Sequence, residues 1–150
     1  MQFAEQTVLA NPLGAKPLDR HDVWRGLERK ARDAVPYVAA ITSCKIVREY
    51  TPTSFDRAVV IQGEVYVERV DLDPPNRVIF TRLKGPVLGV ITNEILDGPE
   101  HLQLRFKFAL TYAPGAQMPV EEEQLIRVMS ADYCAAVKTT LSTCRAQLEE

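Results

Sequence analysis

The last third of the chain carries two patterns that together constrain the fold most strongly. Residues His101–Tyr112 alternate between apolar and polar side chains, which predicts a strand with one buried face. After a loop with Pro and Gly, the run Glu121–Leu148 contains neither of these residues and predicts a helix roughly 40 Å long. A long terminal helix that follows a series of strands favours a curved sheet closed by one helix, an arrangement that can enclose a cavity.

The first forty residues predict one strand and one short helix. Phe3–Leu9 is typical of a strand, and Asp19 is a good N-cap for a helix over Asp19–Asp33. Pro36 interrupts this helix. Its apolar residues recur at helical spacing and indicate an amphipathic helix: Val23, Trp24, Leu27 and Ala31. We expect Trp24 to pack this helix onto the end of the long one; a gating role for Trp24 is the alternative.

The middle of the chain predicts an antiparallel meander. Strand-like segments follow one another with turn signals every ~8 to 12 residues, which favours hairpins over parallel crossover units. We find no internal repeat and no low-complexity segment, so residues 1–150 are expected to form a single domain. The predicted strands of this part are Cys44–Tyr50, Arg57–Gln62, Val65–Leu72, Arg77–Leu83 and Val87–Leu96.

The overall charge argues against two classes of partner. A net charge of −2 and an isoelectric point near 5.8 leave no basic stripe for nucleic acid. No apolar stretch approaches the ~18 residues that a membrane span needs, and the N-terminal ten residues do not resemble a secretory signal. We therefore expect a cytoplasmic protein that does not bind nucleic acid and does not span a membrane. A homodimer is compatible with the sequence.

Cysteine and histidine spacing predicts neither a disulfide framework nor a metal site. Cys134 and Cys144 are separated by about 280° of rotation on a helix, so they face different ways. The two histidines, His21 and His101, are not close to a cysteine in the sequence. We expect the three cysteines, including Cys44, to be free thiols, and we expect no metal and no cofactor.

Several catalytic classes lack their sequence signals. No serine or cysteine lies in a nucleophile elbow, and two scattered histidines do not favour a catalytic triad. The seven glycines form no phosphate-binding loop. An enzyme built on this chain should therefore rely on shape, desolvation and one or two acid–base groups.

The order of the predicted elements and three segments resemble a known family. The segments are VWRGLERKARD (Val23–Asp33), DLDPPNRVIFTRL (Asp71–Leu83) and GVITNEI (Gly89–Ile95). Over almost its whole length the chain is similar to the START/Bet v 1-like superfamily, also called SRPBCC or helix-grip proteins, and within it to the AtaL-like subgroup. The segments contain no catalytic signature.

The resemblance implies an α+β helix-grip fold. In that fold a curved antiparallel sheet of about seven strands wraps around the long C-terminal helix, with short helices between strands 1 and 2 and a cavity between sheet and helix. Members of the superfamily include lipid and hormone binders, polyketide cyclases and aromatases, and proteins that contact other proteins. The fold alone therefore does not select a function.

The strand pattern places one arginine in the expected interior. If Val65 and Val67 face the core, Arg69 does too, and the polar residues between them, Glu64, Tyr66 and Glu68, face outward. An inward arginine is costly unless it is paired or hydrogen-bonded, and it suits a carboxylate, phenolate or enolate ligand. In the alternative, a one-residue bulge flips the pattern and leaves Arg69 on the surface.

Two further polar side chains are candidates for the same interior. Arg82 follows Val78 and Phe80 on the face expected to be buried, and Asn93 lies between Ile91 and Ile95. A surface position remains the alternative for Arg82. For Asn93 the alternative is a structural hydrogen bond to a neighbouring strand.

The inward face of the long helix changes in side-chain size along its length. Met129 and Tyr133 are large, whereas Ala136 and Thr140 are small. The small residues either allow the helix to lie close on the sheet or leave space for a ligand. Tyr133 is either plain core or a group that reaches the cavity.

Our first hypothesis is that the cavity binds a hydrophobic small molecule, either lipid-like, aromatic or polyketide-like. Phe80, Phe106, Phe108, Ile91 and Met129 would form its walls, and Arg69 or Asn93 would orient a polar end. The candidate ligand contacts are Arg69, Phe80, Arg82, Ile91, Asn93, Phe106, Phe108, Met129, Tyr133, Ala136 and Thr140.

Two other functions compete with this one. The first is a cofactor-independent cyclase, aromatase or dehydratase in which Arg69 stabilises an enolate and either Tyr133 or an inward carboxylate transfers the proton. The second is a protein-interaction module that docks through the outer sheet or the long helix, for which an extended exposed apolar patch would be evidence.

Overall fold

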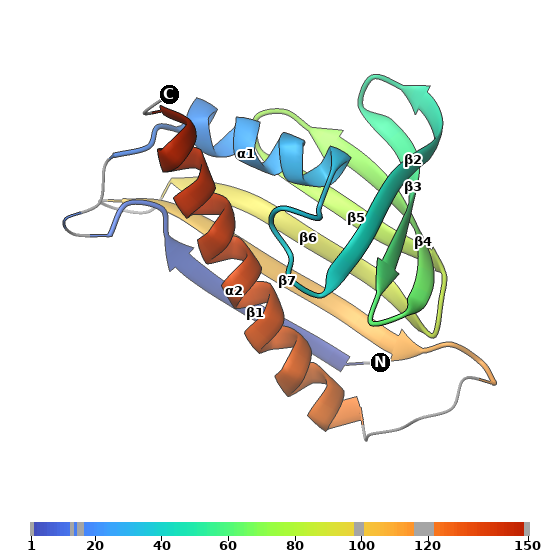
Figure 1. The fold of residues 1–150 in the computed structure, drawn as a ribbon. Helices are drawn as coiled ribbons and strands as arrows, with labels where there is room; N and C mark the ends of the chain where they lie inside the picture. Colours follow the sequence, from blue (N-terminus) through green and yellow to red (C-terminus); the bar gives the residue numbers. More distant parts are fainter. Residues whose placement is uncertain (1, 13, 15–16, 98–100, 116–121, 149–150) are drawn as a thin grey trace.

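The computed structural model describes residues 2–12, 14, 17–97, 101–115 and 122–148 (Figure 1). The chain forms one strand and one helix, then six strands, then the long helix, as the sequence analysis predicts. In chain order these elements are β1 (Gln2–Leu9), α1 (Arg20–Arg32), β2 (Ile41–Thr51), β3 (Ser54–Ile61), β4 (Glu64–Asp73), β5 (Arg77–Lys84), β6 (Val87–Asp97), β7 (Leu102–Tyr112) and α2 (Glu122–Leu148).

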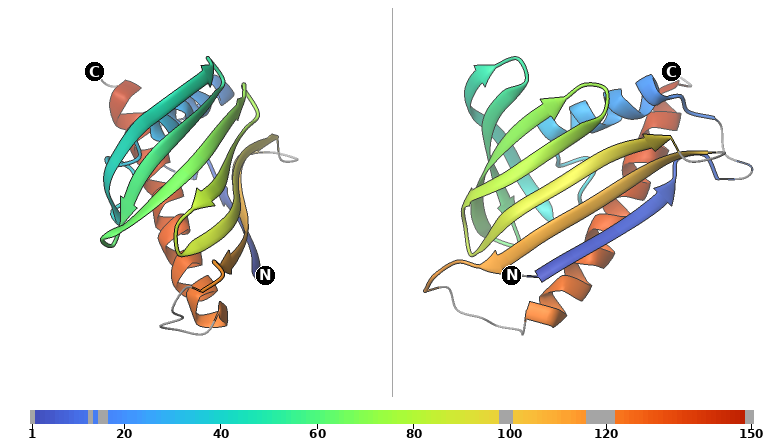
Figure 2. Two further views of the ribbon diagram at one scale, coloured as in Figure 1. Left: turned by 90° about the vertical axis from the view of Figure 1, so that its right-hand side faces the viewer. Right: turned by 180° about the vertical axis from the view of Figure 1, so that it is seen from behind.

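The described strands make one seven-stranded sheet in the order β1-β7-β6-β5-β4-β3-β2. Every neighbouring pair is antiparallel, so the strands from β2 to β7 form a meander and β1 pairs with β7. Figure 2 shows both helices on the same face of this twisted sheet. The α+β helix-grip fold predicted from the sequence is confirmed.

The two helices divide the inner face of the sheet between them. The long helix α2 contacts β1, β7 and α1, and α1 contacts β5, β6 and β2. As Figure 1 shows, α2 runs diagonally across the sheet while α1 covers one end of it. The strands β3 and β4, near the β2 edge of the sheet, therefore lie away from α2.

The start of α1 follows directly from its sequence. The Asp19 carboxylate accepts a hydrogen bond from the Asp22 backbone N–H at 2.8 Å, and the Asp22 carboxylate accepts one from the Asp19 N–H at 2.9 Å. This reciprocal capping box satisfies backbone donors that a helix start leaves unpaired. The predicted N-cap at Asp19 is confirmed.

Alternation in β7 builds the centre of the core. Leu104, Phe106, Phe108 and Leu110 are all buried on one face of the strand. Directly opposite on β6, Ile91 pairs with Phe108 and Asn93 pairs with Phe106. The period-two pattern that predicted a half-buried strand therefore places four side chains of β7 inside.

The helices approach each other closely at Gly26 of α1. A Cβ atom at this position would overlap Sγ of Cys144 on α2, and it would lie 3.5 Å from Cγ2 of Thr140. Thr140 is fully buried, and its hydroxyl donates to the Ala136 carbonyl at 2.8 Å. At Thr140 the small side chain therefore serves the contact between α1 and α2.

The described residues carry no disulfide, and Cys44, Cys134 and Cys144 are free thiols. Burial raises the pKa of the Cys144 thiol, which keeps it protonated at neutral pH. Within the described part of the chain, neither helix combines the length and the apolar character that crossing a membrane requires.

Candidate functional site

Three charged side chains form a row across the inner face of the sheet. Arg57 on β3 lies opposite Glu68 on β4, and Glu68 lies opposite Arg82 on β5. Their exposed fractions are 4%, 2% and 5%. Arg57 donates from Nε and Nη2 to Glu68 Oε1 at 3.1 and 2.9 Å, and Arg82 donates from Nε to Glu68 Oε2 at 3.1 Å. The carboxylate is therefore held between two guanidinium groups.

A fourth charged group enters this interior from α1. Lys30 is 4% exposed, and its Nζ donates to Oδ1 of Asn93 on β6 at 2.8 Å. Arg57 Nη1 connects the row to the same helix by donating to the carbonyls of Lys30 and Ala31, at 3.1 and 2.9 Å. These carbonyls belong to the last turn of α1, where a cation satisfies backbone acceptors and complements the helix dipole.

Burial and neighbouring charges shift the pKa values of this cluster. Burial lowers the pKa of Lys30 from 10.5 to about 8; Arg57 lowers it further, and Glu68 acts in the opposite direction. Burial alone would raise the pKa of Glu68, but the charges and hydrogen bonds of Arg57 and Arg82 outweigh it, so the pKa falls below 4.5. At neutral pH Glu68 is therefore ionised, and Lys30 is mostly protonated with a minor neutral fraction.

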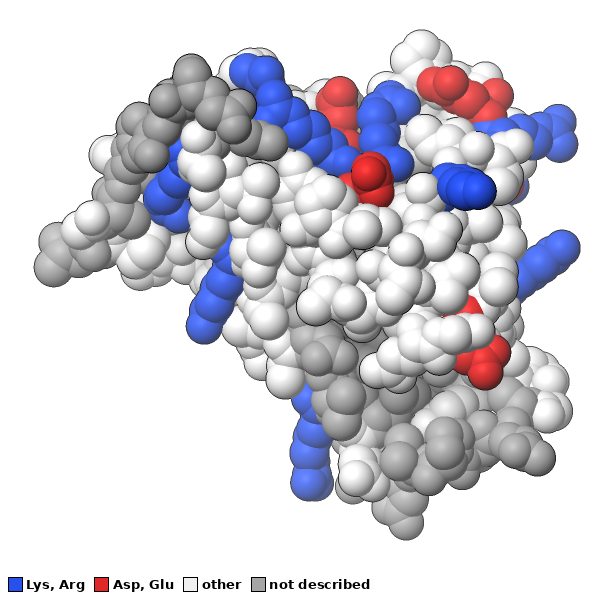
Figure 3. Space-filling view, in the orientation of Figure 1, with Lys and Arg blue, Asp and Glu red and all other residues white. Residues whose placement is uncertain are grey.

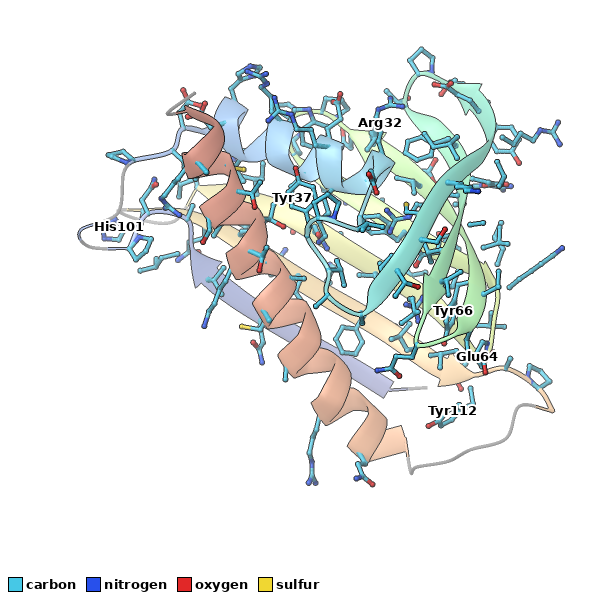
Figure 4. All side chains as sticks on the ribbon, viewed as in Figure 1. Arg32, Tyr37, Glu64, Tyr66, His101 and Tyr112 are labelled. Carbon is cyan, nitrogen blue, oxygen red and sulfur yellow. The ribbon has the colours of Figure 1, made fainter. Side chains whose placement is uncertain are left out.

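Aromatic rings cover the two arginines. The Arg57 guanidinium lies 4.7 Å from the centroid of the Phe80 ring, and that of Arg82 lies 4.4 Å from the centroid of the Tyr66 ring. Burial is the main cause of a raised pKa at Tyr66, so this phenol is protonated at neutral pH. Tyr66 and Tyr112 lie at one end of the sheet, and His101 lies at the other (Figure 4).

The space-filling view agrees with this burial. On the face seen in Figure 3, charged side chains gather at the end that holds α1 and along the margins, while the described residues in the middle are mostly uncharged. Arg57, Glu68 and Arg82 thus lie beneath the surface and do not form a surface patch.

The structure corrects the orientation predicted for Arg69. Its side chain is 42% exposed on the outer face, where Nε donates to Asp56 Oδ1 at 2.9 Å and Nη2 donates to the Tyr50 hydroxyl at 3.1 Å. The surface alternative is therefore the observed one. No bulge in β4 is needed for it, because Tyr66, Glu68, Val70 and Leu72 alternate regularly on the inner face.

The physical reason is a competition between the two faces of β4. Val65 and Val67 made one face look apolar, but Val70 and Leu72 make the other face equally so. The second face is the one that packs in the core, with Val70 fully buried. Packing of this second face brings Glu68 and Tyr66 inside, contrary to our prediction. The buried carboxylate of Glu68 is neutralised by two arginines, which come from the neighbouring strands.

The other predicted positions fall into three groups, of which the first is Ala136 and Thr140, both buried on α2. Phe80, Arg82, Ile91, Asn93, Phe106 and Phe108 are buried on the inner face as expected, and their contact with a ligand stays a prediction. The side chains of Met129 and Tyr133 on α2 lie outside the described residues. Asn93 does make a structural hydrogen bond, but its amide oxygen accepts from Lys30 on the helix α1 and not from a neighbouring strand.

Sequence reasoning missed Lys30 and Arg57 although both carried a signal. Lys30 stands seven residues after Val23 and three after Leu27, on the apolar face of α1. Arg57 stands between Phe55 and Val59 in an alternating segment. A cation at an apolar position was the available clue in both cases, and only the partner from another element explains why it is tolerated.

A separate hollow of about 510 Å³ lies among described residues of β1, β6 and β7. It is lined by Ala4, Glu5, Val90, Thr92, Lys107, Phe108 and Ala109. Val90, Thr92, Lys107 and Ala109 alternate with the inward Ile91 and Phe108, so the hollow opens on the outer face. Its lining includes none of the three residues of the buried row, Arg57, Glu68 and Arg82.

The buried cluster suits an anionic oxygen in an apolar setting. Arg57 and Arg82 bind one carboxylate, Glu68, and a third cation, Lys30, binds Asn93. Phe80 lies against Arg57, and Phe106 lies opposite Asn93. Among the described residues, no group of three or more His, Cys, Asp or Glu side chains is arranged to hold a metal ion. Binding or proton transfer at Lys30 is the chemistry that these side chains offer.

Comparisons with known proteins agree with the fold. A family model described as acetylaranotin biosynthesis cluster protein L, AtaL, matches residues 4–150. No protein with a curated description matches the sequence significantly.

Several solved structures share the fold over nearly the whole chain. A START superfamily protein from Mycobacterium smegmatis is 17% identical, with 97% of this chain and 98% of that chain covered and a TM-score of 0.66. TTHA0849 from Thermus thermophilus is 15% identical, with 99% and 98% covered and a TM-score of 0.68. The di-domain aromatase/cyclase (ARO/CYC) StfQ of the steffimycin pathway is 12% identical, with 99% and 52% covered and a TM-score of 0.71.

Proposed function

The chain belongs to the family described as acetylaranotin biosynthesis cluster protein L, and we propose that it binds a hydrophobic small molecule between the inner face of the sheet and α2. One observation carries the proposal: the inner face is lined with apolar and aromatic side chains around a buried polar cluster. A binding site for a largely apolar metabolite combines these two features, since apolar walls supply affinity and a few polar groups set orientation.

Ile91 and Val90 offer a matched test. Ile91 is buried on the inner face of β6, and its neighbour Val90 is 40% exposed on the outer face. Thermal unfolding is measured with fatty acids, flavonoids and aromatic polyketides. We expect one of these classes to raise the melting temperature of the wild type and of Val90→Phe, but much less that of Ile91→Phe, where the added ring occupies ligand space.

The controls keep this test decisive. Circular dichroism and the melting temperature without ligand establish that both variants are folded. Amide chemical-shift changes on the wild type offer a second measurement, expected at inner positions of β5, β6 and β7. The proposal fails if no ligand class stabilises the wild type, or if ligand-induced shifts map to the outer face.

A second candidate function rests on Lys30. A buried amine with a pKa of about 8 can accept and return a proton near neutral pH. In a cofactor-independent cyclase or dehydratase, neutral Lys30 would take the α-proton of a ketone; the C–H electron pair would form the C=C bond of an enolate while the carbonyl π pair moves to oxygen. Arg57, the buried arginine whose charge acts on Lys30, would take over the enolate-stabilising role that we first assigned to the outward Arg69.

Hydrogen exchange tests this enzymatic candidate without a known substrate. The α-protons of an aryl methyl ketone exchange slowly into D2O, and proton NMR follows the loss of their signal. We expect faster exchange with the wild type and with Lys45→Met, which changes an exposed lysine of β2, but only background exchange with Lys30→Met. Equal rates with and without the wild-type protein would rule out this chemistry.

A further inference from the structure

The ammonium group of Lys30 has more donors than acceptors. It carries three N–H bonds, and Asn93 Oδ1 accepts one of them. Within the part of the chain that the structure describes, the other two have no acceptor. Lys30 is 4% exposed, so water at the surface is not a substitute. A buried cation in this condition costs free energy unless an anion approaches it.

Glu68 does not fill this place, because both of its oxygens are already engaged. Arg57 binds Oε1 and Arg82 binds Oε2. All three nitrogens of the Arg57 guanidinium also donate to protein acceptors: Nε and Nη2 to Glu68, and Nη1 to the carbonyls of Lys30 and Ala31. The one buried carboxylate of the cluster is therefore used by the arginines, and Lys30 is the cation with donors to spare.

We propose that the ligand of the inner site is an anion, and that its charged oxygen binds Lys30 Nζ beside Asn93. This inference rests on the proposed function. Asn93 is buried on the inner face, opposite Phe106 on β7 and between Ile91 and Ile95 along β6. With its charged oxygen at this point, the ligand would place its apolar body along β6 and β7, against Phe106 and Phe108. The ligand class is an amphipathic carboxylate or an acidic enol or phenol.

Binding of such a ligand is coupled to the protonation of Lys30. The charged side chains that act on Lys30 come from three strands: Arg57 from β3, Glu68 from β4 and, through Glu68, Arg82 from β5. An anion beside Nζ favours the protonated amine. Because the pKa of Lys30 without ligand is about 8, the affinity for an anion should fall about tenfold for each pH unit above that value.

Two matched ligand pairs test the charge requirement by isothermal titration calorimetry. The first is dodecanoate against dodecanamide, and the second is 4-hydroxycoumarin, an acidic enol, against 4-methoxycoumarin. The protein samples are the wild type, Lys30→Met and the exposed control Lys45→Met. At pH 7 we expect at least one anion to bind ten or more times tighter than its neutral partner. Lys45→Met should keep that preference, and Lys30→Met should lose it.

Titrations of the wild type at pH 8.5 in buffers of different ionisation enthalpy add a readout that needs no variant. We expect proton uptake on binding of the anion and none on binding of the neutral partner. If Lys30→Met does not fold, this measurement and the wild-type preference decide the question.

The outcomes separate the two proposals. Equal affinity for anionic and neutral partners, or tighter binding of the neutral one, overturns the anion site and leaves hydrophobic binding intact. A preference retained by Lys30→Met, or binding without proton uptake at pH 8.5, overturns the role of Lys30. Failure of all four compounds to bind, together with a negative thermal screen, overturns both proposals.

Discussion

Glu68 is the residue on which the buried charges of the sheet depend. Its carboxylate is the acceptor for both Arg57 and Arg82, and all three side chains are buried. A buried ion pair is weak evidence for stability as a whole, but removal of one partner leaves an uncompensated charge inside. Removal of the Glu68 carboxylate would leave two uncompensated charges, those of Arg57 and Arg82.

We expect Glu68→Gln to lower the free energy of unfolding by about 3 to 5 kcal/mol at pH 7, because two buried guanidinium groups lose their counter-charge. Urea unfolding followed by circular dichroism measures the change. The control is Arg77→Met, which removes a pair with Asp73 whose side chains are about half exposed and should cost no more than about 1 kcal/mol. Equal effects of the two substitutions would contradict the account of the row.

Lys30 leads to a second prediction for a single residue, namely the direction in which the free energy of unfolding changes with pH. Between pH 8 and 10.5 the unfolded chain binds this proton and the folded chain has released it. The free energy of unfolding therefore rises with pH across this window. The rise attributable to Lys30 is at most about 3 kcal/mol.

Urea unfolding at pH 7, 8, 9 and 10 without ligand measures this effect. The difference between wild type and Lys30→Met should move in favour of the wild type above pH 8, because the desolvation penalty of the ammonium disappears there. Parallel pH curves for the two proteins would show that Lys30 titrates at its ordinary value.

At the scale of elements, the contact between α1 and α2 positions Lys30. The contact point is Gly26, four residues before Lys30 on α1, and it faces Cys144 and Thr140 on α2. The last carbonyls of α1 accept hydrogen bonds from Arg57. The part of α1 that carries the Lys30 amine is therefore fixed on one side by Gly26 and on the other by Arg57.

We expect Gly26→Ala to lower the free energy of unfolding by about 1 to 3 kcal/mol, because its methyl group overlaps Cys144 Sγ. In a Cys144→Ala background the overlap is gone, and the same change should be neutral or stabilising, since Ala favours a helix by up to about 1 kcal/mol over Gly. A double-mutant cycle in urea measures the coupling. Additive effects would show that the two helices do not meet at this pair.

The element boundaries were largely predictable. Turn signals between strand-like segments located the strands of the meander, alternation located β7, and Asp19 with Asp22 marked the start of α1. The face of β4 was not predictable, because Val65 and Val67 competed with Val70 and Leu72. A period-two pattern shows that two faces differ, but it does not identify the inner one when both carry aliphatic side chains.

At the scale of the whole molecule, ligand binding should stabilise the fold by mass action. With free ligand at 100 times its dissociation constant, the gain is about 2.7 kcal/mol. For a chain of 150 residues this corresponds to a rise of about 5 to 10 °C in melting temperature. Scanning fluorimetry at increasing ligand concentration measures it.

Arg69 and Arg82 provide the matched comparison for this expectation. Arg69→Ala changes an outward side chain and should retain the full ligand-induced shift, whereas Arg82→Met removes a buried cation of the inner face and should reduce it. A shift that is lost in Arg69→Ala and kept in Arg82→Met would place the ligand on the outer face.

The sequence alone determined the order of the elements and their approximate limits, because periodicity and capping are local properties of the chain, and the resemblance of the sequence to the START/Bet v 1-like superfamily implied the helix-grip fold. The tertiary structure decided which side chains meet inside. Glu68 is tolerated in the interior because β3 and β5 supply its arginines, and Lys30 finds its hydrogen-bond acceptor, Asn93, on β6. The cost of a buried charge depends on partners that are distant in the sequence, and no local pattern records where those partners will lie.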